Sequence, residues 1–170
     1  MNAIVYTSNS GFTERYADLL AAETGLPVYA LGKAAGSLSA GAEIIYMGWL
    51  MAGSIKGYEK AAKNYSVRAV CAVGMVRPSE QVVAGIRKKH QIQNAEVFYL
   101  QGGFDMEKLH GMYKLMVKTM AKTVGKKLEK QADKSAEEEE ILGMLQNGGD
   151  MVSIENLSGV LAWYHAQTDR

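Results

Sequence analysis

The chain has 170 residues, in which 19 Lys and Arg balance 18 Asp and Glu to a formal net charge of +1. This length fits one domain with a core on both faces of a sheet, and the balanced charge argues against wholesale binding of nucleic acid. Cys71 is the single cysteine, which excludes an internal disulfide and a cysteine-rich metal site.

Apolar stretches in the sequence are short. No window approaches eighteen uninterrupted apolar residues, and the amino terminus lacks the charged segment followed by an apolar segment that marks a secretory signal. We therefore expect no membrane span and a cytoplasmic protein.

Apolar segments alternate with amphipathic segments along the whole chain. The predicted strands cover residues 3–7, 27–31, 43–48, 67–75 and 95–100. The predicted helices cover residues 12–24, 58–65, 79–90, about 108–129 and about 154–167, with Ser79 as the N-cap of the third. Residues 33–41 are predicted as a loop or short helical turn, and residues 49–57 as a loop.

Five short apolar strands separated by helices predict an α/β fold, with a parallel sheet covered on both faces. We expect a three-layer sandwich with a five-stranded parallel sheet in the order 2-1-3-4-5. Residues 1–170 then form one domain, with a long helical insertion at about 104–150. In this order ligands bind beyond the carboxyl ends of strands one and three, where the loops at residues 7–13, 49–57 and 74–78 lie.

The first of these loops reads Ser8-Asn9-Ser10-Gly11-Phe12-Thr13 and joins a strand directly to a helix. The first N–H groups of a helix have no intrahelical partner and carry partial positive charge, so this loop is a candidate phosphate site. Its hydroxyls add neutral donors, and Gly11 allows a close approach of the backbone. The loop has neither the GxGxxG nor the GxxxxGK[ST] pattern. Simple capping of the helix by hydroxyls is the alternative.

The two other loops carry residues that could contact a planar ring. Trp49 directly follows the third predicted strand, where it either stacks on a ligand or covers the edge of the sheet. Arg77, in the third loop, either favours negative charge on a reduced ring or is an ordinary solvated residue.

The chain resembles the flavodoxin family. Ser8, Ser10, Gly11 and Thr13 match that family's phosphate loop for FMN, S-x-T-G-x-T, and Trp49 matches in kind its ring-stacking aromatic residue. The resemblance implies a flavodoxin-like fold and bound FMN. It also implies the following cofactor-binding residues: Ser8, Asn9, Ser10, Gly11, Phe12, Thr13, Trp49, Leu50, Met51, Ala52, Gly53, Gly74, Met75, Val76 and Arg77.

Within that family the chain is most similar to the quinone-dependent protoporphyrinogen IX dehydrogenases. These enzymes have a glycine-rich turn after strand five and then a long helix that is basic, aromatic and rich in methionine. Gly102-Gly103-Phe104-Asp105 and the segment from Tyr113 to Lys118 match that pattern, although the loop around Phe104 lacks the enzymes' run of Arg and Tyr. The resemblance implies a site for substrate or partner at the following residues: Gly103, Phe104, Asp105, Lys114 and Lys118.

The long predicted helix carries a lysine at every fourth position from Lys114 to Lys134, with Met112, Met116 and Met120 beside them. A basic amphipathic helix can bind an anionic membrane or an acidic partner. The alternative is a methionine and leucine stripe that packs in the core, with its lysines in solvent. The acidic residues 137–140 either neutralise part of this stripe or form a mobile turn.

These observations favour an FMN-dependent oxidoreductase, with hydride taken from a small-molecule substrate and passed to a quinone or another carrier. The helix from Lys114 to Lys134 then offers contact with the inner face of the membrane. We expect no metal site, because the three histidines have no ligand spacing, and no catalytic side chain, because the flavin would do the chemistry. Two alternatives are an electron carrier that meets a redox partner protein, which the lack of strong acidity disfavours, and an interaction domain that has lost FMN.

Overall fold

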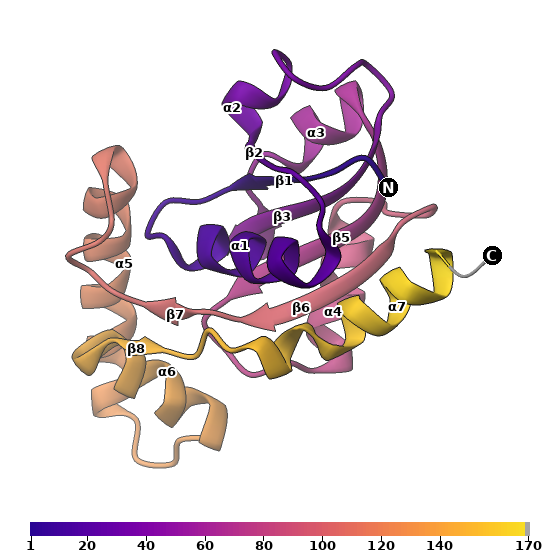
Figure 1. The fold of residues 1–170 in the computed structure, drawn as a ribbon. Helices are drawn as coiled ribbons and strands as arrows, with labels where there is room; N and C mark the ends of the chain where they lie inside the picture. Colours follow the sequence, from indigo (N-terminus) through magenta and orange to yellow (C-terminus); the bar gives the residue numbers. More distant parts are fainter. Residues whose placement is uncertain (169–170) are drawn as a thin grey trace.

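The computed structural model describes residues 1–168, apart from the side chains of Tyr113, Met120, Ala136, Glu137 and Glu140. It is an α/β fold with a mostly parallel central sheet and helices on both faces (Figure 1). Five parallel strands lie in the order β2-β1-β3-β5-β6. They are β1 (Ala3–Thr7), β2 (Val28–Ala30), β3 (Glu43–Met51), β5 (Ser66–Gly74) and β6 (Glu96–Gln101).

The observed sheet has six strands rather than the predicted five, and its order is 2-1-3-5-6 rather than 2-1-3-4-5, because an additional strand precedes β5. The sixth strand, β4 (Ser54–Ile55), pairs antiparallel with the end of β3, where a loop was predicted. Ala52 and Gly53 form the two-residue turn, with φ of 49° and 71°. Positive φ at both turn residues matches the twist of the flanking strands, so β3 continues past Gly48 into a hairpin.

Helices cover the two faces of the sheet in separate groups (Figure 1). One face packs against α1 (Phe12–Thr24), the 3₁₀ helix η1 (Ile154–Leu157) and α7 (Ser158–Thr168). The other packs against α2 (Leu31–Ala34), α3 (Tyr58–Asn64) and α4 (Glu80–Lys89). The Ser79 hydroxyl accepts a hydrogen bond from the Val82 N–H at 3.3 Å, which confirms the predicted N-cap.

Cys71 lies in β5, in the core that α1 and α7 cover, and its side chain is fully buried. Burial raises the pKa of its thiol, because the thiolate would lose its hydration. This thiol is therefore inert at physiological pH, as the sequence predicts.

A helical pair interrupts the chain between β6 and η1. It consists of β7 (Gly103–Phe104), α5 (Gly111–Lys130), α6 (Ala136–Asn147) and β8 (Gly149–Asp150), and β7 pairs antiparallel with β8. Figure 1 shows α5 and α6 beyond one end of the sheet, away from both termini. None of the helices in the described part of the chain is long and apolar enough to cross a membrane.

Of the two interpretations of residues 137–140, the mobile acidic turn is wrong, because these residues lie in α6. The Ser135 hydroxyl accepts from the Glu138 N–H at 3.2 Å, and the Glu138 carboxylate accepts from the Ser135 N–H at 2.9 Å. This capping box starts a helix whose first turn is the acidic run, which suits the positive end of the helix dipole.

Candidate functional site

A cavity of about 320 Å³ lies at the carboxyl ends of β1, β3 and β5, beneath α5 and α6. The three loops singled out in the sequence meet around it. Twelve of the predicted binding residues line its wall: Ser10, Phe12, Thr13, Trp49, Leu50, Met51, Ala52, Gly74, Met75, Gly103, Phe104 and Asp105.

The first wall of the cavity is the entry to α1. Gly11 is the N-cap, in the left-handed region at φ 90°, and no side chain caps the first turn in its place. Its N–H donates to the Ser8 hydroxyl at 3.1 Å, so Ser8 shapes the turn. Thr13 is only 1% exposed, and it lines the cavity. Because buried polar groups need partners, a threonine at the cavity wall suits a polar ligand group.

The second wall is the β3–β4 hairpin. Trp49, Leu50 and Met51 are half-buried at the end of β3, where the sequence predicts the ring contact. The Lys56 ammonium lies 5.9 Å from the centre of the Trp49 ring. This hairpin, rather than a free loop, sets the position of the indole.

The third wall is the end of β5. A Cβ added to Gly74 would lie 2.4 Å from the Tyr99 hydroxyl, which itself donates to the Val76 carbonyl oxygen at 2.7 Å. A side chain at this position would therefore force the Tyr99 ring to shift. Met75 lines the cavity, and the Gln101 side-chain amide donates to its carbonyl oxygen at 3.3 Å.

The roof is apolar and was not predicted. It comes mainly from one face of α5 and from α6, and the lining residues that were missed are Val73, Leu109, Val117, Ala121, Val124, Ile141 and Leu145. The spacing of Val117, Ala121 and Val124 places them on one helix face, and the sequence could have predicted from this spacing that they line the cavity together. Ile141 and Leu145 were not placed, because no separate helix was predicted at the position of α6.

Eight predicted residues lie outside the cavity wall: Ser8, Asn9, Gly11, Gly53, Val76, Arg77, Lys114 and Lys118. Asn9 accepts a hydrogen bond from the His110 N–H at 3.2 Å, which links the first loop to the start of α5. Arg77 is exposed at the surface. Lys114 and Lys118 are exposed too, and the Lys114 ammonium donates to the Glu107 carbonyl oxygen at 3.3 Å.

The outer face of α5 exposes apolar side chains among its lysines. Met112 is 77% exposed, Leu115 70% and Met116 38%. The alternative in which these methionines pack in the core is therefore wrong for Met112 and Met116, and Met120 lies outside the described side chains. Val117 and Ala121 take the core-facing positions instead.

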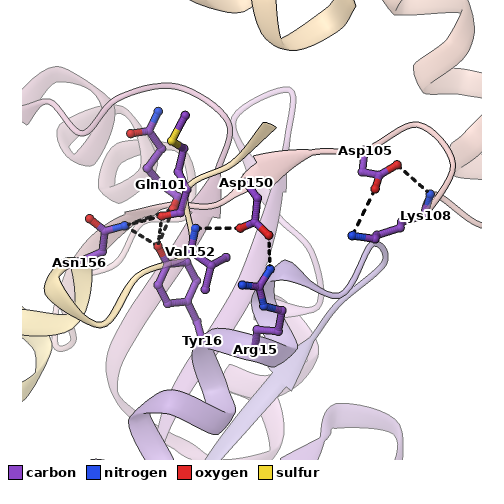
Figure 2. A network of polar contacts seen from close by, with 9 residues as sticks. Arg15, Tyr16, Gln101, Asp105, Lys108, Asp150, Val152 and Asn156 are labelled. Atoms are coloured by element: carbon purple, nitrogen blue, oxygen red, sulfur yellow. Dashed lines mark hydrogen bonds and ion pairs between the residues drawn. The ribbon is translucent and has the colours of Figure 1, made fainter. Parts of the chain in front are cut away.

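A network of polar contacts holds the base of the helical pair to α1 (Figure 2). The Arg15 guanidinium pairs with the Asp150 carboxylate, which also accepts from the Val152 N–H at 3.1 Å. Burial works against the charged form of Asp150, but Arg15 and the backbone donor outweigh it and lower its pKa. Close by, the Asn156 amide donates to the Tyr16 hydroxyl at 2.7 Å.

A second cavity, of about 520 Å³, adjoins the first at Phe12, Phe104 and Asp105. Asp105 lies 3.2 Å from the Lys108 ammonium. Loss of hydration is the largest single effect on this carboxyl and works to raise its pKa, but Lys108 and backbone N–H groups together outweigh it and lower the pKa. Asp105 and Lys108, which both line this second cavity, are thus paired with one another.

In comparisons with protein-family models, curated proteins and solved structures, no match to the chain was found. The interpretation of the cavity depends on its own residues.

Proposed function

We propose that the protein is a flavodoxin-like oxidoreductase that binds FMN in the cavity beneath α5 and α6. The observation that carries this proposal is the meeting of the hydroxyl loop, the Trp49 hairpin and the Gly74–Met75 turn around one apolar cavity. Its volume of about 320 Å³ lies within the range of small-molecule sites. The parallel strands, with β1 central between β2 and β3, support the same ligand position, beyond the carboxyl ends of β1 and β3.

The donors at the α1 entry fit a phosphate. The first-turn N–H groups have no side-chain cap, and Ser10 and Thr13 bring hydroxyls to the same wall. A Cβ at Gly11 would meet no atom within 4 Å, so it is the left-handed φ of 90° that favours glycine there. No lysine or arginine lies in this loop, so neutral donors and the helix dipole would hold the anion.

The chain would bind, orient and shield the ring. Trp49 in β3 and Met75, just past the end of the neighbouring strand β5, line the cavity, and Val117 and Ala121 line it from α5. These apolar groups exclude water from the reacting face. FMN, when bound, supplies the hydride or electron transfer, and the protein tunes it.

The roof favours an enzyme over a simple electron carrier. An electron carrier works best when the edge of its flavin ring is exposed to the partner. Here α5 and α6 enclose a space above the three loops, and a substrate could fill that space. We infer a reduced small molecule as hydride donor, as in the protoporphyrinogen dehydrogenases that the sequence resembles, and a quinone as acceptor. An electron carrier without a substrate of its own is the second candidate.

The outer face of α5 supports a peripheral membrane contact. Leu115 and Met112 are exposed between Lys114, Lys118 and Lys122, so apolar insertion and attraction to anionic lipid would act together. This contact would place the protein at the inner face of the membrane, where a quinone is available.

The experiment is to add FMN to the purified protein and measure binding, and then to assay hydride transfer from protoporphyrinogen to a soluble quinone. Tight FMN binding with turnover supports the enzyme. Tight binding with reversible reduction but no turnover favours the carrier, and no binding of FMN at any concentration contradicts both.

A further inference from the structure

His90 joins the carboxyl end of α4 to the hairpin that carries Trp49. Its Nε2 lies 2.9 Å from the backbone nitrogen of Ile55, in β4, and its Nδ1 lies 2.8 Å from a carboxylate oxygen of Glu59, in α3. The imidazole side chain is only 3% exposed. It is thus a buried titratable group that the proposed function does not use.

The chemistry of these two contacts fixes the protonation state of the ring. A backbone N–H can only donate, so Nε2 must accept and carries no hydrogen. The hydrogen is therefore on Nδ1, where it is donated to Glu59. A second proton, on Nε2, would face the Ile55 N–H and break the hydrogen bond, so the arrangement requires a neutral imidazole.

The hairpin is also held at its turn. The Lys89 ammonium donates to the Ala52 carbonyl oxygen at 2.6 Å, so two consecutive residues at the end of α4 contact the two ends of the hairpin loop. The pairing of Leu50 with Ile55 then carries the constraint to the strand that lines the cavity.

We propose that His90 is a positioning residue for the β3–β4 hairpin, residues 49–55, whose first four residues line the cavity, and that its protonation releases that hairpin. The ring contacts Glu59 and Tyr58 from α3, and the nearest charge on its own helix is that of the preceding residue, Lys89, whose ammonium is bonded to the Ala52 carbonyl oxygen. The inference concerns the hairpin itself, and it rests on the proposed function only where FMN is used as a probe.

The first test uses the protein without FMN and with the substitution Trp163→Phe, so that Trp49 is the only tryptophan. Titration from about pH 8 to pH 5 covers the range in which imidazoles change charge. The Trp49 emission should change in a single one-proton transition. His90→Gln, whose amide oxygen can accept from Ile55 at any pH, should remove that transition, whereas His165→Gln in α7 should leave it intact.

A second measurement needs no variant at position 90. The ¹⁵N resonances of the His90 ring in the wild-type protein report which nitrogen carries the hydrogen, and amide exchange at Ile55 reports the hydrogen bond. At neutral pH, Nδ1 should be protonated and Nε2 bare, and the protection of Ile55 should fall on acidification. A hydrogen on Nε2 at neutral pH, or a Trp49 transition that survives His90→Gln, overturns the proposal.

FMN gives a third readout that separates this inference from the proposed function. Because the phosphate itself titrates near pH 6, the comparison is between wild type and His90→Gln across the same pH range. From pH 8 to pH 5 the wild-type affinity should fall about fivefold more than that of the variant, as loss of one hydrogen bond predicts. If no FMN binds but the Trp49 and ¹⁵N results hold, the proposed function fails and the role of His90 stands.

Discussion

The backbone N–H of Met151 donates to the carbonyl oxygen of Gly102 at 2.7 Å. The chain therefore returns from α5 and α6 to the point at which it left the sheet, and β7 and β8 form the narrow ribbon that it passes through both times. Three contacts hold the roof of the cavity in place. They are this ribbon, the ion pair between Arg15 and Asp150, and the hydrogen bond that the Asn9 side chain accepts from the His110 N–H.

The ribbon should not tolerate a side chain at Gly103. A Cβ there would lie 2.3 Å from the Gly149 carbonyl oxygen, a backbone atom that cannot move without opening the ribbon. We expect Gly103→Ala to lower the free energy of unfolding by about 1–3 kcal/mol in urea denaturation. Gly125→Ala is the matched control, since its Cβ meets nothing within 4 Å in α5 and should stabilise by about 0.5–1 kcal/mol.

Phosphate binding at the α1 entry is tested by Thr13→Val, which removes the buried hydroxyl and keeps the shape. A hydrogen bond to a charged group contributes about 1.5–3 kcal/mol, so the Kd for FMN should rise at least about tenfold in titration calorimetry. Riboflavin lacks the phosphate and should bind about equally to both proteins. Equal losses for the two ligands would mean that the phosphate is held elsewhere.

The position of the ring is tested by tryptophan fluorescence. If the flavin stacks on Trp49, FMN should quench its emission strongly, and Trp49→Ala should abolish most of that quenching. Trp163 lies in α7 against Phe98, outside the cavity, and Trp163→Ala should leave the fractional quenching of Trp49 unchanged. Full quenching in Trp49→Ala would move the ring away from the hairpin.

Membrane contact through α5 is tested with vesicles that contain anionic lipid. Changing Lys114, Lys118 and Lys122 to Gln should weaken association at low salt, because each basic side chain near the surface contributes about 1 kcal/mol. Changing the exposed Lys33, Lys60 and Lys63 to Gln alters the net charge equally and should have a much smaller effect. FMN affinity should survive both triple changes. Failure of the wild type to sediment with vesicles at any salt concentration would remove this contact.

The Arg15–Asp150 pair predicts a pH dependence of stability. The pKa of Asp150 is lowered in the folded protein, so the pair stabilises the fold above the carboxyl's unfolded pKa of about 4 and stops doing so as pH falls through the folded value. Both side chains are about half exposed, so Asp150→Asn should cost less than about 1 kcal/mol at pH 7. The difference between wild type and variant should vanish in denaturation at about pH 2, and a constant difference at all pH values would contradict the assignment.

The sequence predicted the parts of the molecule that depend on local patterns. The five parallel strands have continuous apolar runs, and Gly11 and Ser79 mark helix starts at the positions observed. The three loops around the cavity were predicted because parallel strands bring their carboxyl ends together, whatever the details of packing.

Features that depend on distant contacts were missed. Leu50 and Met51 extend β3 by pairing with β4, which turns back on them, and Ala52 is a rare residue for a turn with positive φ. Helix α6 was missed because a run of acidic residues reads as solvated sequence unless the Ser135 cap is given weight. Without α6, the apolar roof and the exposure of Met112 could not be derived.

Burial of Cys71 has a practical consequence. Its thiol is inaccessible and weakly acidic, so the wild-type chain is already a background without reactive cysteines for chemical labelling. A cysteine placed at Leu115 would be the one thiol that a maleimide probe modifies in the folded protein. A spin label or dye at that position could then report the depth of α5 in a bilayer or its distance from a bound flavin, with no need to remove a native cysteine from the core.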